Sequence, residues 1–382
     1  MLSPGAFRGL RQPPVRKGQV SFLGWPAVNP TFKKTRSMQL PREIIAGHDV
    51  LPQIAQMTRD FGLKGTGVLV WGPQTRALAG DKIAQTLSDA GYDLQTLEAG
   101  DATAEAVSEV KEIASECKAT FLVGIGGGTK IDIAKLGASD LSIPFISVPT
   151  NCAHDGIASP RATIKVEGRI KSFDARVPLG VLADTAVLIK APWRFLAAGC
   201  ADVISNKTAI LDWRLAHRLR NEEFSSSAAT MSEMSAEAII GEAEFLKRNL
   251  EESAWLIVRP IIVSGVSMAI AGSSRPASGS EHLVSHALDS IAPGHALHGE
   301  QCGVGTIMMM ALHGGDFKRI RRALESVGAP TTIRQLGITK EQMVEALTTA
   351  HRIRPDRYTI LGDQGITAEA AERLMELSGV AG

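Results

Sequence analysis

Apolar runs and amphipathic stretches alternate along the first half of the chain. A β-rich run covers residues 65–71, a weaker one covers residues 93–97, and a continuous apolar run covers residues 119–125. Residues 77–91 and 104–117, which separate these runs, have the three- and four-residue apolar spacing of helices. This order of strand, helix, strand, helix, strand predicts a parallel sheet covered by helices, with ligands at the carboxyl ends of the strands.

The same alternation continues for about 70 residues. A helix is expected at residues 129–139 and a strand at residues 144–148, which ends abruptly at Pro149. A hairpin is expected around residues 162–172, and a short strand at residues 185–189. The sheet is therefore expected to continue to about residue 190.

A change of pattern follows at Pro192, after which nearly every segment has helical length and Ala-rich amphipathic spacing. The fold class expected is an α/β N-terminal Rossmann-like parallel-sheet domain followed by an all-α C-terminal domain. We place the first domain at residues 38–190 and the second at residues 191–382. No internal repeat is visible.

Composition fits a globular protein with a large core, since 44% of the 382 residues are hydrophobic and 21% are charged. The formal charge of +1 conceals an asymmetry, because the first 37 residues hold seven basic residues and no acidic one. The rest has 34 basic against 40 acidic residues, a net charge of −6, which argues against nucleic acid as a partner.

The basic stretch 1–37 is the least patterned part of the chain. Its five prolines interrupt any amphipathic targeting helix, and it has no continuous apolar core for secretion. We interpret it as a disordered tail, or as an extension upstream of a start at Met38, and leave it out of the fold argument.

The four cysteines form no CxxC pair, so neither a disulfide framework nor a thiolate zinc site is implied. A reducing, cytoplasmic setting fits this usage. The apolar stretches at residues 121–125 and 255–270 are broken by Gly, Arg, Pro and Ser, and neither approaches the uninterrupted length of a membrane helix. No stable membrane insertion is expected.

A run of glycines joins an expected strand to an expected helix at residues 124–132 (GIGGGTKID). Without side chains, such a loop lets phosphate oxygens approach backbone N–H groups at a helix N-terminus. The plainer interpretation is a tight turn with no ligand. The loop is not a Walker loop, because Lys130 does not stand in the pattern GxxxxGK[ST]. Asp132 could stabilise the start of the helix as well as meet a ligand.

The segment GGGTKIDIAK (residues 126–135) resembles the GGGxxxDxAK signature of the superfamily of iron-containing alcohol dehydrogenase, glycerol dehydrogenase and dehydroquinate synthase. In that superfamily the loop holds the NAD(P) pyrophosphate, and the Pro-Thr turn at the end of the next strand lies beside the nicotinamide; residues 147–156 (SVPTNCAHDG) match this turn. The resemblance implies that Asp155 lies on the substrate side. It assigns the following residues to the cofactor, NAD or NADP: Gly128, Thr129, Lys130, Ile131, Asp132, Thr150, Asn151, Cys152, Ala153 and Ser159.

Four residues in the helical half could form a metal site: Asp202, His282, His286 and His298. His282 and His286 are spaced i, i+4, so on a helix they share a face. Two imidazoles and a carboxylate suit Zn²⁺ with an open position. Local spacing does not show that these segments meet, and a single histidine is more often a surface or core residue.

The resemblance gives these residues roles. The segments SGSEHxxxH (residues 278–286) and HALHGEQ (residues 295–301) resemble the corresponding segments of the glycerol-1-phosphate dehydrogenases. This resemblance implies that Asp202, His282 and His298 bind one Zn²⁺ per subunit. It also implies that His286 faces the substrate and that Asp202 and His286 are catalytic. His286 is the alternative to His282 as the ligand. Lys207 is a candidate for the substrate phosphate, its plainer interpretation being a solvated lysine on a helix.

The activity implied is the reversible NAD(P)-dependent reduction of dihydroxyacetone phosphate to sn-glycerol 1-phosphate, for ether-type glycerophospholipids. The resemblance also implies a homo-oligomer in the cytoplasm. The alternative is a glycerol dehydrogenase acting on unphosphorylated glycerol or dihydroxyacetone. More distant alternatives are a dehydroquinate synthase, which should carry more basic residues for its acidic substrate, and a non-catalytic protein that binds NAD or a membrane surface.

Overall fold

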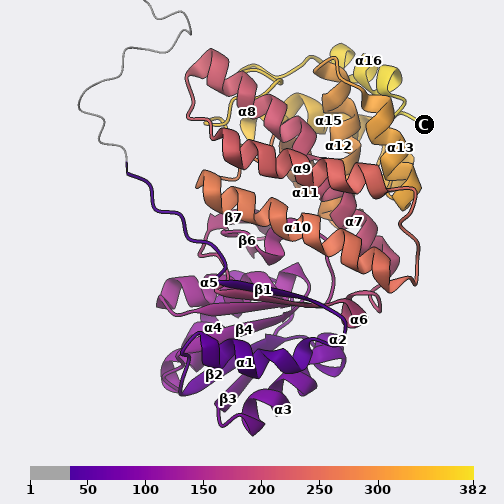
Figure 1. Ribbon diagram of the computed structural model, residues 1–382. Helices are drawn as coiled ribbons and strands as arrows, with labels where there is room; N and C mark the ends of the chain where they lie inside the picture. The colour runs from indigo at the N-terminus through magenta and orange to yellow at the C-terminus, as the bar shows by residue number, and fades with distance from the viewer. Residues whose placement is uncertain (1–34) are drawn as a thin grey trace, which may run out of the picture. The chain divides into compact units, whose positions relative to one another are not determined.

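The computed structural model describes residues 35–382, so the interpretation of residues 1–37 as a tail or extension lies almost wholly outside the described residues. Residues 38–382 form one compact unit. Its N-terminal part holds a parallel six-stranded sheet in the order β1-β8-β5-β4-β2-β3 (Figure 1). The strands are β1 Glu43–Gly47, β2 Thr66–Trp71, β3 Asp93–Glu98, β4 Phe121–Gly126, β5 Phe145–Pro149 and β8 Gly180–Asp184.

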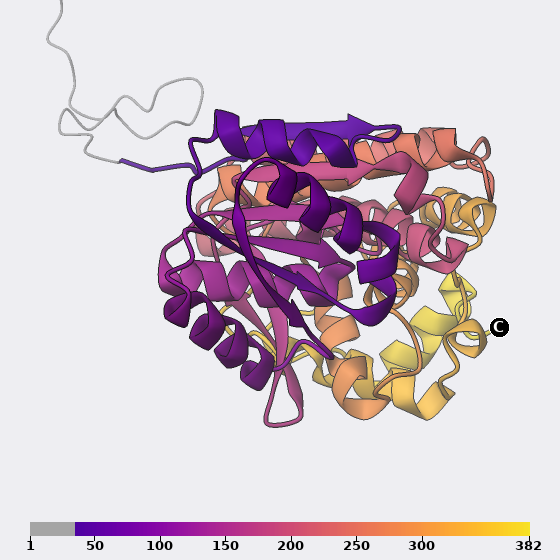
Figure 2. The same ribbon diagram turned by 90° about the horizontal axis from the view of Figure 1, so that it is seen from below.

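Alternate residues of the central strands supply two different hydrophobic cores, because successive side chains of a strand point to opposite faces. Val68 and Val70 of β2 belong to the core that includes residues of α4 and α5, whereas Leu69 lies in the core that includes residues of α1 and α3. Helices therefore cover both faces of the sheet, as Figures 1 and 2 show. The helices of this part are α1 Ile54–Asp60, α2 Pro73–Thr75, α3 Asp81–Asp89, α4 Ala104–Glu116, α5 Gly128–Leu141 and α6 Thr185–Leu188.

The end of the sheet differs from the prediction. The expected strand at residues 185–189 is wrong: the strand is β8, immediately upstream, and Thr185–Leu188 is the short helix α6. Asp184 explains the difference, because its carboxylate accepts hydrogen bonds from the backbone N–H groups of Ala186 (3.0 Å) and Leu51 (3.1 Å). A side chain that caps a helix start ends the strand at that point.

The expected hairpin is present as an antiparallel pair outside the main sheet, β6 Arg161–Val166 and β7 Arg169–Asp174. The remainder is helical, which confirms the expected fold class. Its helices are α7 Trp193–Ile204, α8 Asn206–Arg220, α9 Ser226–Glu242, α10 Glu251–Ala271, α11 Ser280–Ile291, α12 His298–Leu312, α13 Phe317–Val327, α14 Ile333–Leu336, α15 Lys340–Thr349 and α16 Ala368–Ser378.

Helix α10 is the one helix in the described part of the chain with the length and apolar composition of a membrane span. Its most apolar window is 61% buried inside the protein, and α10 packs against α9 and α7. A helix that is apolar on most sides and enclosed by other helices has the properties of a core helix.

Candidate active site

The carboxyl ends of β2, β3 and β4 meet around Lys130, on the first turn of α5. The Lys130 ammonium donates to the backbone carbonyl of Gly100, which follows β3. Thr75, which follows β2, donates its hydroxyl to the carbonyl of Ile125 in β4 (3.0 Å). The glycine loop thus lies at the edge of the sheet where parallel α/β folds bind ligands.

Side chains that follow β5 lie directly over the glycine loop. A Cβ atom at Gly127 would stand 2.5 Å from the amide nitrogen of Asn151, and one at Gly128 would overlap the His154 ring. The loop therefore accepts only glycine at these two positions without rearrangement. Backbone N–H groups at the start of α5 remain close to any group bound there, which suits phosphate oxygens.

The other nucleotide candidates occupy these same two segments. Thr129 and Lys130 are on the first turn of α5, and Thr150 is buried and donates its backbone N–H to Gly126 (2.9 Å). The side chains of Ile131 and Cys152 belong to the hydrophobic core. These two residues could therefore meet a ligand only through their backbone. The remaining two, Ala153 and Ser159, lie in the segment between β5 and β6, Ala153 partly exposed and Ser159 fully buried.

Asp132 has both carboxylate oxygens bonded within the protein. One accepts from the ammonium of Lys135 (3.0 Å) and the other from the backbone N–H of Thr163 in β6 (2.9 Å). Lys135 is fully buried and also donates to the carbonyls of Gly156 (2.6 Å) and Arg161 (2.5 Å). This network joins α5 to the hairpin and to the segment after β5. In the structure Asp132 therefore helps to position these three segments.

Asp202 on α7 is brought to two histidines that are far away in sequence. Its Oδ1 lies 3.6 Å from His282 Nε2 on α11 and 3.8 Å from His298 Nε2 at the start of α12. This oxygen is buried and has no hydrogen-bond partner among the described residues. Two atoms bound to one tetrahedral Zn²⁺ at the usual bond lengths are separated by about 3.4 Å.

Both imidazoles are oriented by their other ring nitrogen. His282 Nδ1 donates to the buried carboxylate of Glu281 (2.9 Å), and His298 Nδ1 lies 3.0 Å from the Ser285 hydroxyl. In each ring Nε2 is left facing Asp202. Second partners of this kind are typical of metal-binding histidines, and the orphaned carboxylate oxygen calls for a cation.

Burial sets the protonation of these groups. It lowers the pKa of His298 to about 3 and that of His282 well below its ordinary range, so both rings are neutral at neutral pH. Burial also raises the pKa of Asp202, because the ionised carboxylate has lost its water and has no partner for its charge. Two neutral imidazoles beside a carboxylate that has no cation as a partner form a donor set that fits a divalent metal ion.

Two glycines allow the helices that carry the candidate ligands to approach closely. A Cβ atom at Gly299 on α12 would overlap the carbonyl oxygen of Ala198 on α7, and one at Gly199 would overlap the carbonyl oxygen of Cys152. Arg194 of α7 makes a two-bond pair with Glu300 of α12, each bond 2.6 Å long. These contacts hold the start of α12, and hence His298, against α7.

His286 lies beside this cluster but is not brought to Asp202. Its ring stacks on His298 with centroids 5.7 Å apart, and its Nδ1 is 3.6 Å from Asp289. His286, Asp289 and His298 form a second, more exposed group of possible ligand atoms. Of the two histidines between which the sequence left a choice, His282 is therefore the one beside Asp202.

The segment after β5 connects the glycine loop to this cluster. The backbone N–H of Asp155 donates to Asp202 Oδ2 (3.0 Å), and its carboxylate accepts from the hydroxyl of Ser264 on α10 (2.7 Å). Asp155 therefore stands between the nucleotide candidates and the metal candidates. Burial raises the pKa of its carboxyl.

Lys207, the sequence candidate for the substrate phosphate, is engaged elsewhere. Its ammonium pairs with Glu233 at 3.0 Å and Glu237 at 2.8 Å, both on α9. A cation already held by two carboxylates is less available to a third anion, so the structure does not favour this assignment. Sequence spacing could not reveal the pair, because α9 follows α8 in the chain and only the packing of the two helices brings the groups together.

Sequence reasoning missed two members of the cluster, Glu281 and Cys302. The thiol of Cys302 lies 3.6 Å from His298 Nε2 and is fully buried, and burial raises its pKa. A signal was present for both: Glu281 directly precedes His282, and Cys302 is four residues after His298, on the same face of a helix.

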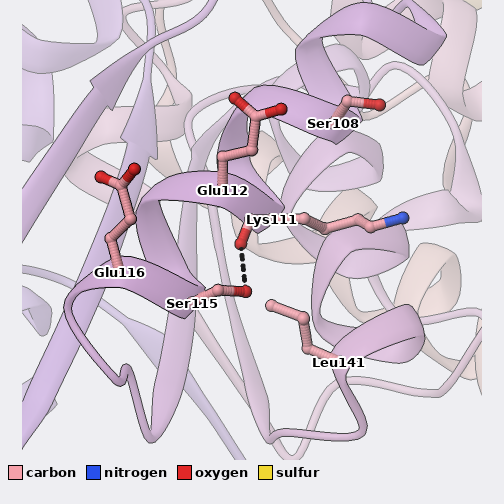
Figure 3. A pocket seen from close by; sticks show the side chains of 6 residues that line it. All are labelled: Ser108, Lys111, Glu112, Ser115, Glu116 and Leu141. Carbon is pink, nitrogen blue, oxygen red and sulfur yellow. Dashed lines mark hydrogen bonds between the residues drawn. The ribbon is translucent and has the colours of Figure 1, made fainter.

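A shallow pocket on the outer side of α4 lies apart from this site (Figure 3). Its lining includes Lys111, which pairs with Asp140 (2.8 Å), and Leu141 at the end of α5. The 14 residues of α5 separate Leu141 from the glycine loop, which corresponds to roughly 20 Å at 1.5 Å per residue. The pocket therefore does not join the nucleotide and metal candidates.

Comparison with known proteins agrees with this geometry. A family model described as iron-containing alcohol dehydrogenase matches residues 45–192. Two solved structures share the fold: a probable glycerol dehydrogenase from Sinorhizobium meliloti (TM-score 0.74, 21% identity, 90% of this chain and 98% of that one) and glycerol dehydrogenase from Schizosaccharomyces pombe (TM-score 0.75, 19% identity, 91% and 92%).

Curated relatives are much more similar in sequence. Glycerol-1-phosphate dehydrogenase, NAD(P)+, from Methanosarcina mazei is 53% identical over 343 residues, covering 90% of this chain and 96% of the relative. The protein of the same name from Methanothermobacter thermautotrophicus is 52% identical over 345 residues, covering 90% and 99%. The chain therefore belongs to the family of the glycerol-1-phosphate dehydrogenases.

Proposed function

We propose that this chain catalyses the reversible NAD(P)-dependent reduction of dihydroxyacetone phosphate to sn-glycerol 1-phosphate, using a bound divalent metal ion. The observation that carries the proposal is the orphaned, buried oxygen of Asp202 facing two imidazole Nε2 atoms, in a chain about half identical to named glycerol-1-phosphate dehydrogenases. Unphosphorylated glycerol is the less favoured substrate, because the two glycerol dehydrogenases of similar fold are only 19–21% identical to this chain and share the fold alone.

The glycine loop and the segment after β5 would bind the nucleotide. Backbone N–H groups at Gly128 and Thr129 begin α5, where the partial positive charge of the helix favours a pyrophosphate. Thr150, Asn151 and Ala153 follow β5 and would contact the nicotinamide half. Asp132 and Lys135 hold these two segments together through the buried hydrogen bonds described above.

Asp202, His282 and His298 would hold the metal ion, most simply Zn²⁺. Such an ion, when bound, polarises the C2 oxygen of the substrate as a Lewis acid. The bound nucleotide would supply the hydride chemistry at the nicotinamide C4. The protein's part is to hold the ketone between the two sites and to exclude water from the transfer.

Asp155 and His286 would act on the substrate side. The Asp155 carboxyl, whose pKa is raised by burial, lies between the nucleotide segment and Asp202 and would accept or donate a hydrogen bond at a substrate hydroxyl. His286 stacks on His298 and is oriented through Nδ1 by Asp289. We assign to its ring the transfer of a proton to and from the C2 oxygen.

The decisive experiment measures NADH and NADPH oxidation with dihydroxyacetone phosphate and with dihydroxyacetone, and determines the product's configuration with enantiomer-specific enzymes. Two charge-assisted bonds to phosphate, each contributing about 1.5–3 kcal/mol, would favour the phosphorylated ketone by on the order of a hundredfold or more in kcat/KM. Equal rates with both ketones would favour a glycerol dehydrogenase. The sn-3 product would contradict the proposal even if phosphate were required.

The wider setting of the reaction belongs to the same proposal. The product would enter ether-type glycerophospholipid synthesis in the cytoplasm, and the enzyme would act as a homo-oligomer without stable membrane insertion. Light scattering coupled to size-exclusion chromatography tests the oligomer. Fractionation of cells that produce the full chain tests the location.

A further inference from the structure

The proposed substrate carries a phosphate, and Lys207 is already held by Glu233 and Glu237. Only three bonds separate C2 of dihydroxyacetone phosphate from its phosphorus. The phosphate must therefore lie close to any group that binds the C2 oxygen. Its partner should be a cation near the metal candidates that no carboxylate already holds.

Arg357 is a buried cation beside the start of α11, the helix that carries His282. Its Nη1 donates to the backbone carbonyl of Ser278 (2.6 Å), and its Nη2 donates to the hydroxyl of Ser274 (2.8 Å). Its Nε is buried and has no hydrogen-bond partner among residues 35–382. A buried N–H group without an acceptor costs stability, so this atom is suited to a ligand that supplies one.

The charge of Arg357 is not balanced by a carboxylate of its own. Glu222 and Asp356 are near enough to raise its pKa, but burial, and then the nearby charges of other arginines, outweigh them and lower it to about 9. Each of these carboxylates is bonded elsewhere: Glu222 accepts two hydrogen bonds from Arg275, and Asp356 accepts two from Arg354. Three arginines therefore face two carboxylates, a net charge of +1 within this group. A buried positive charge without a partner favours an anion.

Arg357 also lies near the metal candidates. Ser278, which accepts from Arg357, precedes His282 by four residues, about one turn or 5.4 Å of helix. Burial and the two neighbouring histidines have the largest effects in lowering the pKa of His282, and the charge of Arg357 lowers it further. This separation suits a substrate in which phosphate and C2 are three bonds apart.

We propose that Arg357 binds the phosphate of the substrate, with its Nε donating to a phosphate oxygen. This inference rests on the proposed function, since it names a phosphate-binding residue of the same site. A guanidinium group suits the role because N–H groups on one of its edges match two oxygens of a phosphate. Nη1 and Nη2 each have a second N–H group, and their bonds to Ser278 and Ser274 orient the guanidinium plane.

The competing explanation is that Arg357 only holds the loop between Ser274 and Ser278 in front of α11. Loss of that role would displace His282 and would slow the reduction of any ketone. Loss of a phosphate contact would instead slow the reduction of the phosphorylated ketone alone. A comparison of two ketones therefore separates the two explanations.

The test measures kcat/KM of the full-length enzyme for dihydroxyacetone phosphate and for dihydroxyacetone. In Arg357→Met, the preference for the phosphorylated ketone should fall by about 10- to 150-fold, mainly through KM. Arg357→Lys keeps the charge but lacks the Nε donor, so its preference should fall by a smaller factor. Lys207→Gln is the control, and it should keep the wild-type preference.

Binding gives a second measurement that does not depend on turnover. Calorimetric titration with sn-glycerol 1-phosphate should show weaker binding to Arg357→Met by a similar factor, while unchanged NADH affinity shows that the variant is folded. If Arg357→Met does not fold, Arg357→Lys decides by the same ratio of the two ketones. An unchanged preference, or an equal loss for both ketones, would overturn the inference and leave the proposed function intact. A wild type without preference for the phosphorylated ketone would overturn both.

Discussion

Replacing Asp202 with Asn should make the metal-free protein more stable while abolishing its response to metal. The change keeps the oxygen that accepts from the backbone of Asp155 and removes the buried charge that has no partner. An unsatisfied buried group costs about 1–3 kcal/mol, and more when charged. The new amide can donate toward His282 or His298, whose Nε2 atoms face it.

The expected size follows from the length of the folded unit. At about 2.1 cal/mol/K of unfolding entropy per residue, the roughly 345 residues from Met38 onward shift Tm by about 1.4 °C per kcal/mol. Metal-free Asp202→Asn should therefore melt about 1.5–4 °C above the wild type. Zinc at a hundred times its Kd should stabilise the wild type by about 2.7 kcal/mol, or roughly 4 °C, and the variant hardly at all.

The difference should depend on pH with a defined sign. Burial raises the pKa of Asp202 above its ordinary value of 3.8, so between the unfolded and the folded pKa the folded protein holds a proton that the unfolded chain has lost. The contribution of Asp202 to the free energy of unfolding is fully present below pH 3.8 and falls as the pH rises toward the folded pKa. The advantage of Asp202→Asn should therefore vanish near pH 3.8 and grow above it.

Asp212 provides the matched control, because it is a buried aspartate with every oxygen bonded. It accepts from the backbone and hydroxyl of Ser280 (2.7 and 2.6 Å), from His313 (3.0 Å) and from the backbone of Ile360 (2.7 Å). Asp212→Asn should lower stability by about 1–3 kcal/mol, since the new amide nitrogen would face donors that a carboxylate oxygen now accepts from. Scanning calorimetry of both metal-free variants decides the matter: a lower Tm for Asp202→Asn, or an unchanged zinc response, would refute the reasoning.

Three further changes test the rest of the site. Gly128→Val should abolish NADH binding, measured by fluorescence titration, because its side chain would occupy the place of the His154 ring; unchanged affinity in a folded variant would remove the loop from the nucleotide site. Lys135→Met should cost about 3–5 kcal/mol in urea denaturation, since it leaves Asp132 buried without its ion pair; a smaller loss would show that Asp132 finds other partners. Gly299→Ala should weaken zinc binding in chelator competition, because α12 must move away from α7, whereas Gly241→Ala, with open space around it, should leave zinc binding unchanged.

Most of the sheet was predictable because its signal is local. The apolar run of β4 is buried on both faces, and the glycine loop after it marks the strand's end without tertiary information. The failure at residues 185–189 is also local. TAVLI has the composition of a buried strand, but the carboxylate of Asp184 bonds the backbone of Ala186 and begins a helix. Capping by one side chain outweighed the β-propensity of five residues.

The site was less predictable because its partners come from separate helices. Asp202, His282 and His298 were recognised through motif resemblance, and nothing in their spacing showed that α7, α11 and α12 converge. The ion pair of Lys207 with Glu233 and Glu237 could not be predicted for the same reason, since it exists only because α8 and α9 pack together. Charge type and spacing specify which groups could form a site, while helix packing decides which of them meet.

The convergence itself depends on residues that carry no chemistry. At Gly199 and Gly299 a single methyl group would overlap a backbone carbonyl, of Cys152 and Ala198 respectively. The first contact fixes α7, and so Asp202, against the segment that follows β5; the second fixes the start of α12, and so His298, against α7. Since that segment after β5 also lies over the glycine loop, the two glycines couple the distance between the candidate metal ligands to the distance between those ligands and the glycine loop. The proposed hydride transfer would require both distances at once, so we attribute the geometry of the proposed site to these two helix contacts as much as to the candidate ligands.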